Sequence, residues 1–226
     1  MPSLLVTGAN RGVGFQLARH FAVEGWSVIA TCRDPGSAHE LTSMGGDVEV
    51  MTLDVNSSKS VLSLKSQLGD RPIDRLINNA GVYGPRTDFG DTDYDEWLNV
   101  LNTNTLGPMR MIEAFCDNVA ASELKQIFNL SSKMGSMAST TVSNGVIYRS
   151  SKAALNMVCR SSAAALTDRG VTVVNFHPGW VQTDMGGPQA DFTPEESRDM
   201  LVKTFANMGP ENSGLLYQPD GDLIPW

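Results

Sequence analysis

The chain has 226 residues, of which 41% are hydrophobic and 19% are charged, a composition typical of one soluble globular domain. Its formal net charge of −8 argues against duplex nucleic acid or an anionic membrane surface as the main partner. The three cysteines are odd in number, widely spaced and without C-x-x-C pairing, which indicates reduced thiols in a cytoplasmic protein. The first apolar run, 4–6, meets Gly8 at once, so we expect neither a signal peptide nor a membrane span.

Short apolar runs rich in β-branched residues alternate along the chain with longer segments of helical periodicity. We expect strands at 3–7, 27–31, 48–53, 73–78, 126–131, 171–176 and near 214–217, and helices at 13–24, 58–68, 94–118 and 153–167. Several strands are continuously apolar, as parallel strands covered on both faces are. The sequence therefore predicts an α/β, doubly wound Rossmann fold, with a mostly parallel seven-stranded sheet and helices on both faces.

Two helix starts are marked by capping residues. Asn56-Ser57 precedes the helix expected at 58–68, and Thr193-Pro194-Glu195-Glu196 is a capping box with proline at the first helical position. No linker, repeat or low-complexity run interrupts the chain. We therefore expect 1–226 to form a single dinucleotide-binding and catalytic domain.

A glycine-rich turn follows the first expected strand directly and opens the first helix. Gly8 permits a tight turn, Gly12 lets the backbone approach a pyrophosphate, and Gly14 lets the helix pack on the sheet. No Gly-Lys-Ser/Thr follows, which excludes a triphosphate-binding loop and leaves an ordinary glycine-rich turn as the alternative. Because a helix N-terminus favours phosphate, we expect dinucleotide contacts from Gly8, Asn10, Arg11, Gly12, Val13 and Gly14.

The end of the second strand bears on the choice between NAD and NADP. An NAD enzyme usually has a carboxylate there to bind the ribose 2′-hydroxyl, whereas this chain has Cys32 followed by Arg33. Together with Arg11 in the glycine turn, Arg33 suits a 2′-phosphate. Asp34 could present a carboxylate after a small loop shift, and the two arginines could simply be solvated. The sequence predicts NADP(H) as the preferred cofactor, with NAD(H) as the alternative.

Two further strand ends carry polar residues. Asp54 and Val55 follow the third strand and are placed to meet the adenine. The segment Asn78-Asn79-Ala80-Gly81 ends the fourth strand, at the sheet edge where ligands bind in this architecture. We expect cofactor contacts from Asp54, Val55, Asn78, Ala80 and Gly81, although Asn78 could equally be a turn residue.

Tyr148 and Lys152 lie four residues apart and therefore share one helix face. A tyrosine near its ordinary pKa of about 10 is a poor proton shuttle at neutral pH, and a neighbouring ammonium is expected to lower that pKa. Ser131-Ser132 ends the fifth strand, where a hydroxyl could bind a substrate carbonyl. Asn104 is unfavourable within a helix. It either faces solvent or holds a kink and a water near Lys152.

The sequence resembles the short-chain dehydrogenase/reductase family. Matching motifs follow in the family's order over essentially the whole chain: Thr7-Gly8-x-x-x-Gly12-x-Gly14, Asn78-Asn79-Ala80-Gly81, Asn104, Ser132, Tyr148-x-x-x-Lys152 and Pro178-Gly179-x-x-x-Thr183. The resemblance implies that Tyr148 is the general acid/base and that Lys152 binds the nicotinamide ribose. It also implies that Ser132 orients the carbonyl and Asn104 completes a proton relay. The residues implied to hold the nicotinamide are Pro178, Gly179, Val181 and Thr183.

Within that family the chain is similar to the C-factor and sniffer-type carbonyl reductases. The similar segments are Thr31-Cys32-Arg33, the run from Tyr148 to Asn156, the run from His177 to Gly187, and Ile224-Pro225-Trp226. This similarity implies reduction of a small carbonyl substrate (a ketone, aldehyde or quinone) by NADPH. A non-catalytic dinucleotide-binding signalling protein and an NAD-linked alcohol dehydrogenase remain the alternatives.

The segment between Ser132 and Tyr148 is longer than is common in the family. The additional residues fall within 133–146. We expect the substrate wall to come from 134–143, 83–87 and 180–192. Its candidate apolar lining residues, each of which could equally belong to the core, are Met134, Met137, Trp180 and Met185. Ser131 is the weaker candidate for the serine role. The three histidines show no metal-ligand spacing, and no metal is expected. By analogy with the family, the helices expected at 94–118 and 148–167 would pair two copies in a homodimer or homotetramer.

Overall fold

Seven parallel strands form the centre of the computed structural model, which describes residues 1–226. Their order is β3-β2-β1-β4-β5-β6-β7, and all six neighbouring pairs are parallel. The strands are β1 (Ser3–Thr7), β2 (Ser27–Cys32), β3 (Val48–Thr52), β4 (Arg75–Asn78), β5 (Gln126–Leu130), β6 (Thr172–Phe176) and β7 (Leu216–Tyr217). The predicted doubly wound α/β fold is confirmed. The strand order reverses between β1 and β4, and ligands bind at such a switch point.

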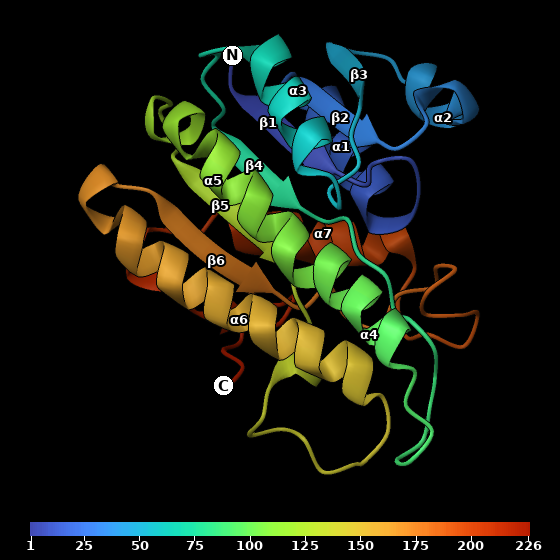
Figure 1. Ribbon diagram of the computed structural model, residues 1–226. Coiled ribbons are helices and arrows are strands. Elements are labelled where there is room, and N and C mark those ends of the chain that lie inside the picture. Colours follow the sequence, from blue (N-terminus) through green and yellow to red (C-terminus); the bar gives the residue numbers. More distant parts are fainter.

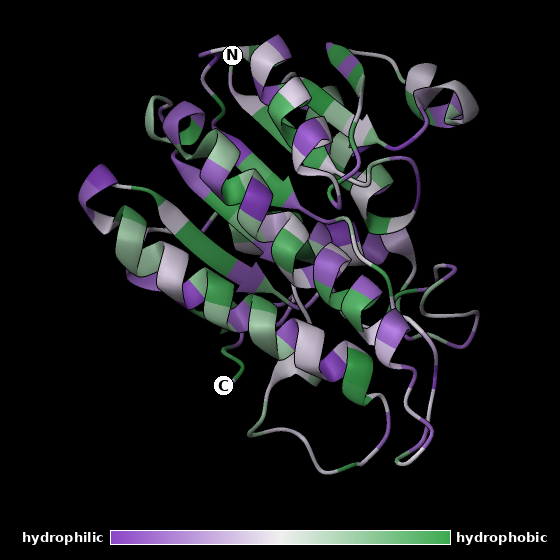
Figure 2. Cartoon of the chain, in the orientation of Figure 1, coloured by the Kyte–Doolittle hydropathy of each residue, from purple (hydrophilic) through white to green (hydrophobic).

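Helices cover both faces of this sheet (Figure 1). They are α1 (Gly12–Val23), α2 (His39–Thr42), α3 (Ser58–Leu68), α4 (Tyr94–Leu101), α5 (Gly107–Ala120), α6 (Val146–Leu166) and α7 (Pro194–Phe205). One apolar core joins the sheet to α1 and α7, and a second core of similar size joins it to α3, α5 and α6. Figure 2 shows the corresponding hydrophobic residues on the strands and on the inner sides of the helices. Burial on both faces explains why the strands read as continuous apolar runs.

Two predicted helix starts are present in the structure. The Ser57 hydroxyl accepts from Ser60 N–H at the start of α3. The Thr193 hydroxyl accepts from Glu196 N–H, and the Glu196 side chain accepts from Thr193 N–H, which completes a capping box at α7. No helix combines the length and the apolarity needed to cross a bilayer.

The continuous helix predicted for 94–118 is wrong in one respect. The structure divides it into α4, a π-helical turn at Asn102–Leu106, and α5. The break occurs at Asn104, whose side chain is drawn out of the helix to bond the backbone of Val82. Such single π-helical turns mark places where a helix is adapted to a functional site.

Candidate active site

A cleft of about 760 Å³ lies at the carboxyl ends of the strands, where the switch point between β1 and β4 leads ligands to bind. It is lined by the glycine turn, by the ends of β2, β3, β4 and β5, by the first turns of α6, and by 178–186. The predicted site residues that line it are Gly8, Asn10, Arg11, Gly12, Val13, Arg33, Asp54, Val55, Ala80, Gly81, Ser132, Tyr148, Lys152, Pro178, Gly179, Val181 and Thr183. Segments far apart in the sequence therefore meet in one cavity.

The glycine turn has the geometry that a bound phosphate requires. Gly8 and Gly12 adopt positive φ angles of 65° and 56°, which disfavour other residues. A Cβ on Gly14 would clash with the Asn79 side chain and the Gly8 carbonyl, so this glycine permits close packing, as predicted. Gly14 does not line the cleft, so the dinucleotide contact that was also expected of it is not found. Helix α1 begins at Gly12, and no side chain caps its N-terminus. Its first amides remain available to a ligand, and the residues of this turn fit a dinucleotide.

The end of β4 is tied to this turn by Asn79. Its side-chain Nδ2 donates to the carbonyl oxygens of Thr7 and Gly8 at 2.8 and 2.9 Å, and the Thr7 hydroxyl accepts from Asn79 N–H. Asn78, which was expected to contact the cofactor, lies behind the cleft instead. Because side chains alternate along a strand, Asn79 rather than Asn78 is directed to the ligand side, and this alternation could have identified it.

Asn78 belongs to a buried ladder of amides across the sheet. Asn78, Asn129 and Asn175 occupy matching positions on β4, β5 and β6. The side-chain amide of each donates to the side-chain oxygen of the next, and that of Asn175 donates to Asn156 on α6, at distances of 2.8 to 2.9 Å. The Ser131 hydroxyl donates to Asn156 Oδ1 at 2.7 Å. The ladder therefore holds the ends of three strands and α6 together directly behind the cleft.

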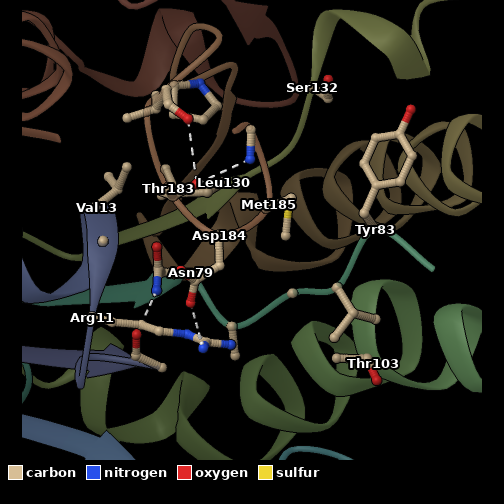
Figure 3. A pocket seen from close by; sticks show the side chains of 18 of the residues that line it. Arg11, Val13, Asn79, Tyr83, Thr103, Leu130, Ser132, Thr183, Asp184 and Met185 are labelled. Atoms are coloured by element: carbon tan, nitrogen blue, oxygen red, sulfur yellow. Dashed lines mark hydrogen bonds and ion pairs between the residues drawn. The ribbon is translucent and has the colours of Figure 1, made fainter. Parts of the chain in front are cut away.

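The ribose end of the cleft holds the two predicted arginines. Arg33 lines the cleft and forms no ion pair, whereas Asp34 turns away, with its Oδ1 accepting from Gly36 N–H at 3.0 Å. Arg11 also lines the cleft but pairs with Asp184 at 2.7 Å (Figure 3). Both partners are largely exposed, so solvent screens this pair. Asp54 lines the adenine end, with Oδ1 accepting from Asn56 N–H.

Ser132, Tyr148 and Lys152 meet at the other end of the cleft, and all three are buried. Tyr148 and Lys152 lie one turn apart on α6, while Ser132 directly follows the end of β5. Lys152 Nζ lies 5.7 Å from the centroid of the Tyr148 ring and donates to the Leu130 carbonyl oxygen at 2.8 Å. The strand end thus positions the ammonium group that the helix carries.

Burial dominates the protonation of this pair. It lowers the pKa of Lys152 to about 8. The expected lowering of the Tyr148 pKa is not found: burial raises that pKa above its ordinary value, a hydrogen bond with Ser132 opposes the rise, and Tyr83 adds to it. Loss of hydration therefore dominates the pKa of Tyr148. Tyr148 is consequently a protonated phenol at neutral pH, the form that donates a proton.

Asn104 is fully buried, which excludes the solvent-facing alternative. Its Nδ2 donates to the Val82 carbonyl oxygen at 2.7 Å and to Ser151 Oγ at 3.0 Å, and its Oδ1 accepts from Val82 N–H at 2.8 Å. A Cβ on Gly81 would stand 3.3 Å from Asn104 Oδ1 and 3.7 Å from Lys152 Nζ. Both polar groups therefore border the same small space, which glycine leaves open.

The two adjacent serines have different hydrogen-bonding partners. Ser131 donates its hydroxyl proton into the asparagine ladder, whereas the Ser132 hydroxyl accepts from Met134 N–H at 3.1 Å. Because a hydroxyl has one proton to donate, Ser131 is committed to the ladder, whereas Ser132 directs its hydroxyl to the phenol of Tyr148 and is the better placed to bind a carbonyl oxygen beside it. The geometry agrees with the predicted order of preference.

Residues 3–193 match the family model described as short chain dehydrogenase. The chain belongs to the short-chain dehydrogenase family. It is an NAD(P)-dependent oxidoreductase of the class that interconverts alcohols and carbonyls.

Two relatives illustrate the range of this family. The chain is 40% identical over 155 residues to the C-signal protein of Myxococcus xanthus, an alignment that spans 69% of this chain and 93% of that protein. It is 34% identical over 232 residues to the 1-hydroxy-2-glutathionyl-2-methyl-3-butene dehydrogenase of Rhodococcus sp. (strain AD45), with both chains covered completely.

Solved structures of carbonyl reductases share the whole fold. The carbonyl reductase Sniffer of D. melanogaster aligns with a TM-score of 0.90 at 28% identity, covering 100% of both chains. The NADPH-bound carbonyl reductase from chicken fatty liver aligns with a TM-score of 0.91 at 31% identity, covering 100% of this chain and 99% of that one. The predicted resemblance to the C-factor and sniffer-type branch is thereby confirmed.

The short-chain dehydrogenase also carries an aromatic pair that its motifs did not identify. The Tyr83 ring stacks on the Tyr148 ring with centroids 4.6 Å apart and an interplanar angle of 17°. Tyr83 lies within the predicted pocket wall 83–87. Its ring is on a loop and that of Tyr148 is on a helix, and no sequence motif predicts that two such rings stack. Of the apolar wall candidates, Met134, Trp180 and Met185 line the cleft, whereas Met137 points to solvent.

The long loop at 133–146 is anchored by the last residues of the chain. Ser136 Oγ hydrogen-bonds the Pro225 carbonyl oxygen, and Ala138 N–H donates to the Trp226 carbonyl oxygen at 2.9 Å. In Figure 1 the C-terminus accordingly lies beside the segment between β5 and α6. This anchor fixes the base of the loop that borders the Tyr148 end of the cleft.

Proposed function

We propose that the enzyme reduces a small carbonyl substrate, a ketone, aldehyde or quinone, with NADPH, and that Tyr148 donates the proton. The observation that carries this proposal is the meeting of Ser132, Tyr148 and Lys152 in the same cleft as the uncapped glycine turn. A site for binding alone does not need a buried phenol, hydroxyl and amine at one end of its cleft. A reaction that moves a proton does.

Different residues of the cleft act on the cofactor and on the carbonyl group of the substrate. A bound reduced nicotinamide supplies the hydride in this chemistry, and Pro178, Gly179, Val181 and Thr183 are the residues that would hold its ring. Ser132 donates a hydrogen bond to the carbonyl oxygen and stabilises the negative charge that develops there.

Tyr148 then transfers its phenolic proton to that oxygen. Lys152 bears its positive charge beside the phenolate that results and stabilises it. Tyr148 enters the reaction as a protonated phenol at neutral pH, because burial raises its pKa above its ordinary value. Asn104 holds the turn of α6 below Tyr148 through Ser151, whose hydroxyl donates to the Tyr148 carbonyl oxygen at 2.7 Å.

The ribose end supports NADPH over NADH. Arg33 faces the cleft without an acidic partner, while Asp34 does not line the cleft and one of its carboxylate oxygens accepts from Gly36 N–H. Arg11 can add a second contact only by giving up Asp184. A guanidinium with no partner suits a 2′-phosphate, which forms charge-assisted hydrogen bonds.

The test is Tyr148→Phe, with Tyr94→Phe as its matched control. Tyr94 is an exposed phenol on α4, so its loss should leave turnover unchanged. If Tyr148 is the acid, its variant should lose about a hundredfold or more in kcat for every carbonyl that the wild type reduces, while NADPH affinity remains. Near-native turnover by Tyr148→Phe would reject the mechanism.

Similarity to the C-signal protein favours one further candidate, a signalling protein that binds the dinucleotide without physiological turnover. Tight NADPH binding with no reduction across a broad panel of ketones, aldehydes and quinones would support it over the reductase. An NAD-linked alcohol dehydrogenase would instead turn over alcohols with NAD faster than carbonyls with NADPH. A cytoplasmic location and pairing into dimers or tetramers remain predictions.

A further inference from the structure

Three side chains form a column at the Tyr148 end of the cleft. The Tyr83 ring stacks on Tyr148, and the Arg86 guanidinium lies over the Tyr83 ring, 5.2 Å from its centroid. All three residues line the cleft. Figure 3 shows Tyr83 on the opposite side of the cavity from Arg11 and Val13, and therefore away from the dinucleotide turn. Through the ring of Tyr83, the column connects the reacting phenol to an exposed cation.

The guanidinium of Arg86 has no protein partner for its charge. None of the five ion pairs of the chain includes it, and it donates no side-chain hydrogen bond. Contact with the ring of Tyr83 holds the cation in place through a cation–π interaction, but it satisfies none of the five N–H donors. An exposed arginine that is oriented yet unpaired is available to bind an anion.

The charges lining the cleft differ from those of the whole chain. Although the net charge is −8, the cleft has four cations and two carboxylates, which are Arg11, Arg33, Arg86, Lys152, Asp54 and Asp184. Both carboxylates, with Arg11 and Arg33, come from the dinucleotide end. Near Tyr83, Arg86 meets no acidic lining residue, so a substrate anion there would find attraction against a globally repulsive field.

We propose that the carbonyl substrate bears a carboxylate, and that Arg86, held on the ring of Tyr83, binds it. This inference rests on the proposed reductase function and names its substrate class. The Tyr148 and Tyr83 ring centroids are 4.6 Å apart, and the guanidinium lies 5.2 Å from the Tyr83 centroid. The distance from the guanidinium to the Tyr148 centroid is therefore at most the sum of these two distances. An aromatic spacer of one or two rings between the carbonyl and the carboxylate spans that distance, and its face can pack against the edge of the Tyr83 ring, beside the column.

The experiment compares four aldehydes: a benzaldehyde with a para carboxylate, a biphenyl aldehyde with a carboxylate on the far ring, and the carboxamide counterpart of each. KM and kcat are measured with NADPH for wild type, Arg86→Gln and Arg86→Lys, at low and at high salt. Arg19→Gln is the matched control, because it removes one exposed positive charge outside the cleft. The Kd of each aldehyde and of NADPH is measured by calorimetry with the same proteins.

We expect wild type to prefer at least one carboxylate over its carboxamide, chiefly through KM. Arg86→Gln should raise KM for that carboxylate about tenfold and leave the carboxamide unchanged, since a charge-assisted hydrogen bond is lost. Arg86→Lys should retain part of the preference, Arg19→Gln all of it, and high salt should reduce it. The Kd of NADPH should be the same in all four proteins, because Arg86 lies away from the dinucleotide turn.

Two failures can be told apart. If wild type reduces aldehydes without a carboxylate preference, or if Arg86→Gln leaves the preference intact, the inference is wrong and the reductase function stands. If wild type reduces none of the aldehydes, the proposed reduction is not supported by this panel. The Kd values of the aldehydes then test whether Arg86 binds a carboxylate. A carboxylate preference in Kd that Arg86→Gln abolishes would support it, and equal Kd values would overturn it.

Discussion

Replacing Asn104 with alanine should weaken both the fold and the reaction. The wild-type side chain makes three hydrogen bonds, two with the backbone of Val82 and one with Ser151. Alanine leaves the N–H and C=O of Val82 without these partners, and an unsatisfied buried group costs about 1–3 kcal/mol. Because Val82 lies partly at the surface, water compensates in part, and we expect a loss of about 2–3 kcal/mol in the free energy of unfolding.

The assay is urea denaturation followed by circular dichroism, together with kcat under conditions in which the variant is fully folded. Asn99→Ala is the control: Asn99 is an exposed asparagine one turn earlier, with its amide bonded only to Glu96. This control should change stability by less than about 0.5 kcal/mol, as surface substitutions usually do. Since Asn104 supports the turn of α6 that carries Tyr148, kcat should fall about tenfold or more in Asn104→Ala.

The result that would refute this reasoning is specific. If Asn104→Ala and Asn99→Ala had the same midpoint in urea and the same kcat, the buried contacts of Asn104 would support neither the fold nor the site. A change in stability without a change in kcat would leave Asn104 a structural residue only. Asn104→Asp should be worse than alanine in stability, because it buries a carboxylate and sets one of its oxygens against the Val82 carbonyl oxygen with no proton between them.

Three further outcomes are expected. Arg33→Ala should raise the Kd for NADPH about tenfold or more and leave NADH nearly unchanged, whereas Arg19→Ala should change neither; equal weakening of both dinucleotides in Arg33→Ala would contradict a 2′-phosphate contact. Ser132→Ala should lower kcat by about a hundredfold with little effect on stability, and Ser131→Ala should act mainly on stability through the asparagine ladder, which urea denaturation and turnover together would separate. With the pKa of Lys152 lowered to about 8, its cation is lost as the pH rises through 8, so kcat/KM for reduction should fall above that pH. Stability should change in the opposite sense: the folded chain binds this proton less tightly than the unfolded chain, so this group's contribution to stability rises between pH 8 and 10.5, and Lys152→Met should remove that rise in unfolding experiments.

Much of the fold could be predicted because its signals are local. Each strand is a short apolar run, each capped helix start is marked within four residues, and the glycine turn joins a strand to a helix without a gap. The strand ends were placed to within two residues, since hydrogen bonding at the ends depends on the neighbouring strand. The break in the helix at 94–118 falls at Asn104, where a kink was one of two expected alternatives, but only the structure shows that the backbone of Val82, outside this segment, causes it.

The site could be predicted only where a motif carried it. Tyr148 and Lys152 share a helix face by spacing alone, but the sign of the pKa change at Tyr148 depends on how completely the fold buries it. Asn78 and Asn79 are identical in type, and the register of β4 decided which one faces the cleft. The pairing of Arg11 with Asp184 joins segments more than 170 residues apart, and no local pattern announces it.

By itself the sequence determined the alternation of strands and helices, the phosphate-binding turn and the Tyr148–Lys152 pair, because spacing along a helix or strand dictates those relations. Only the tertiary structure decided what each side chain meets: Tyr83 on Tyr148, Arg86 on Tyr83, and Asp34 turned away from the ribose end. These contacts depend on loops brought together by the order of the strands. Burial and hydrogen-bonding partners determine the protonation state of a side chain and the groups it can contact. The chemistry of the cleft could therefore be inferred only from the structure, in which the sheet places those loops side by side.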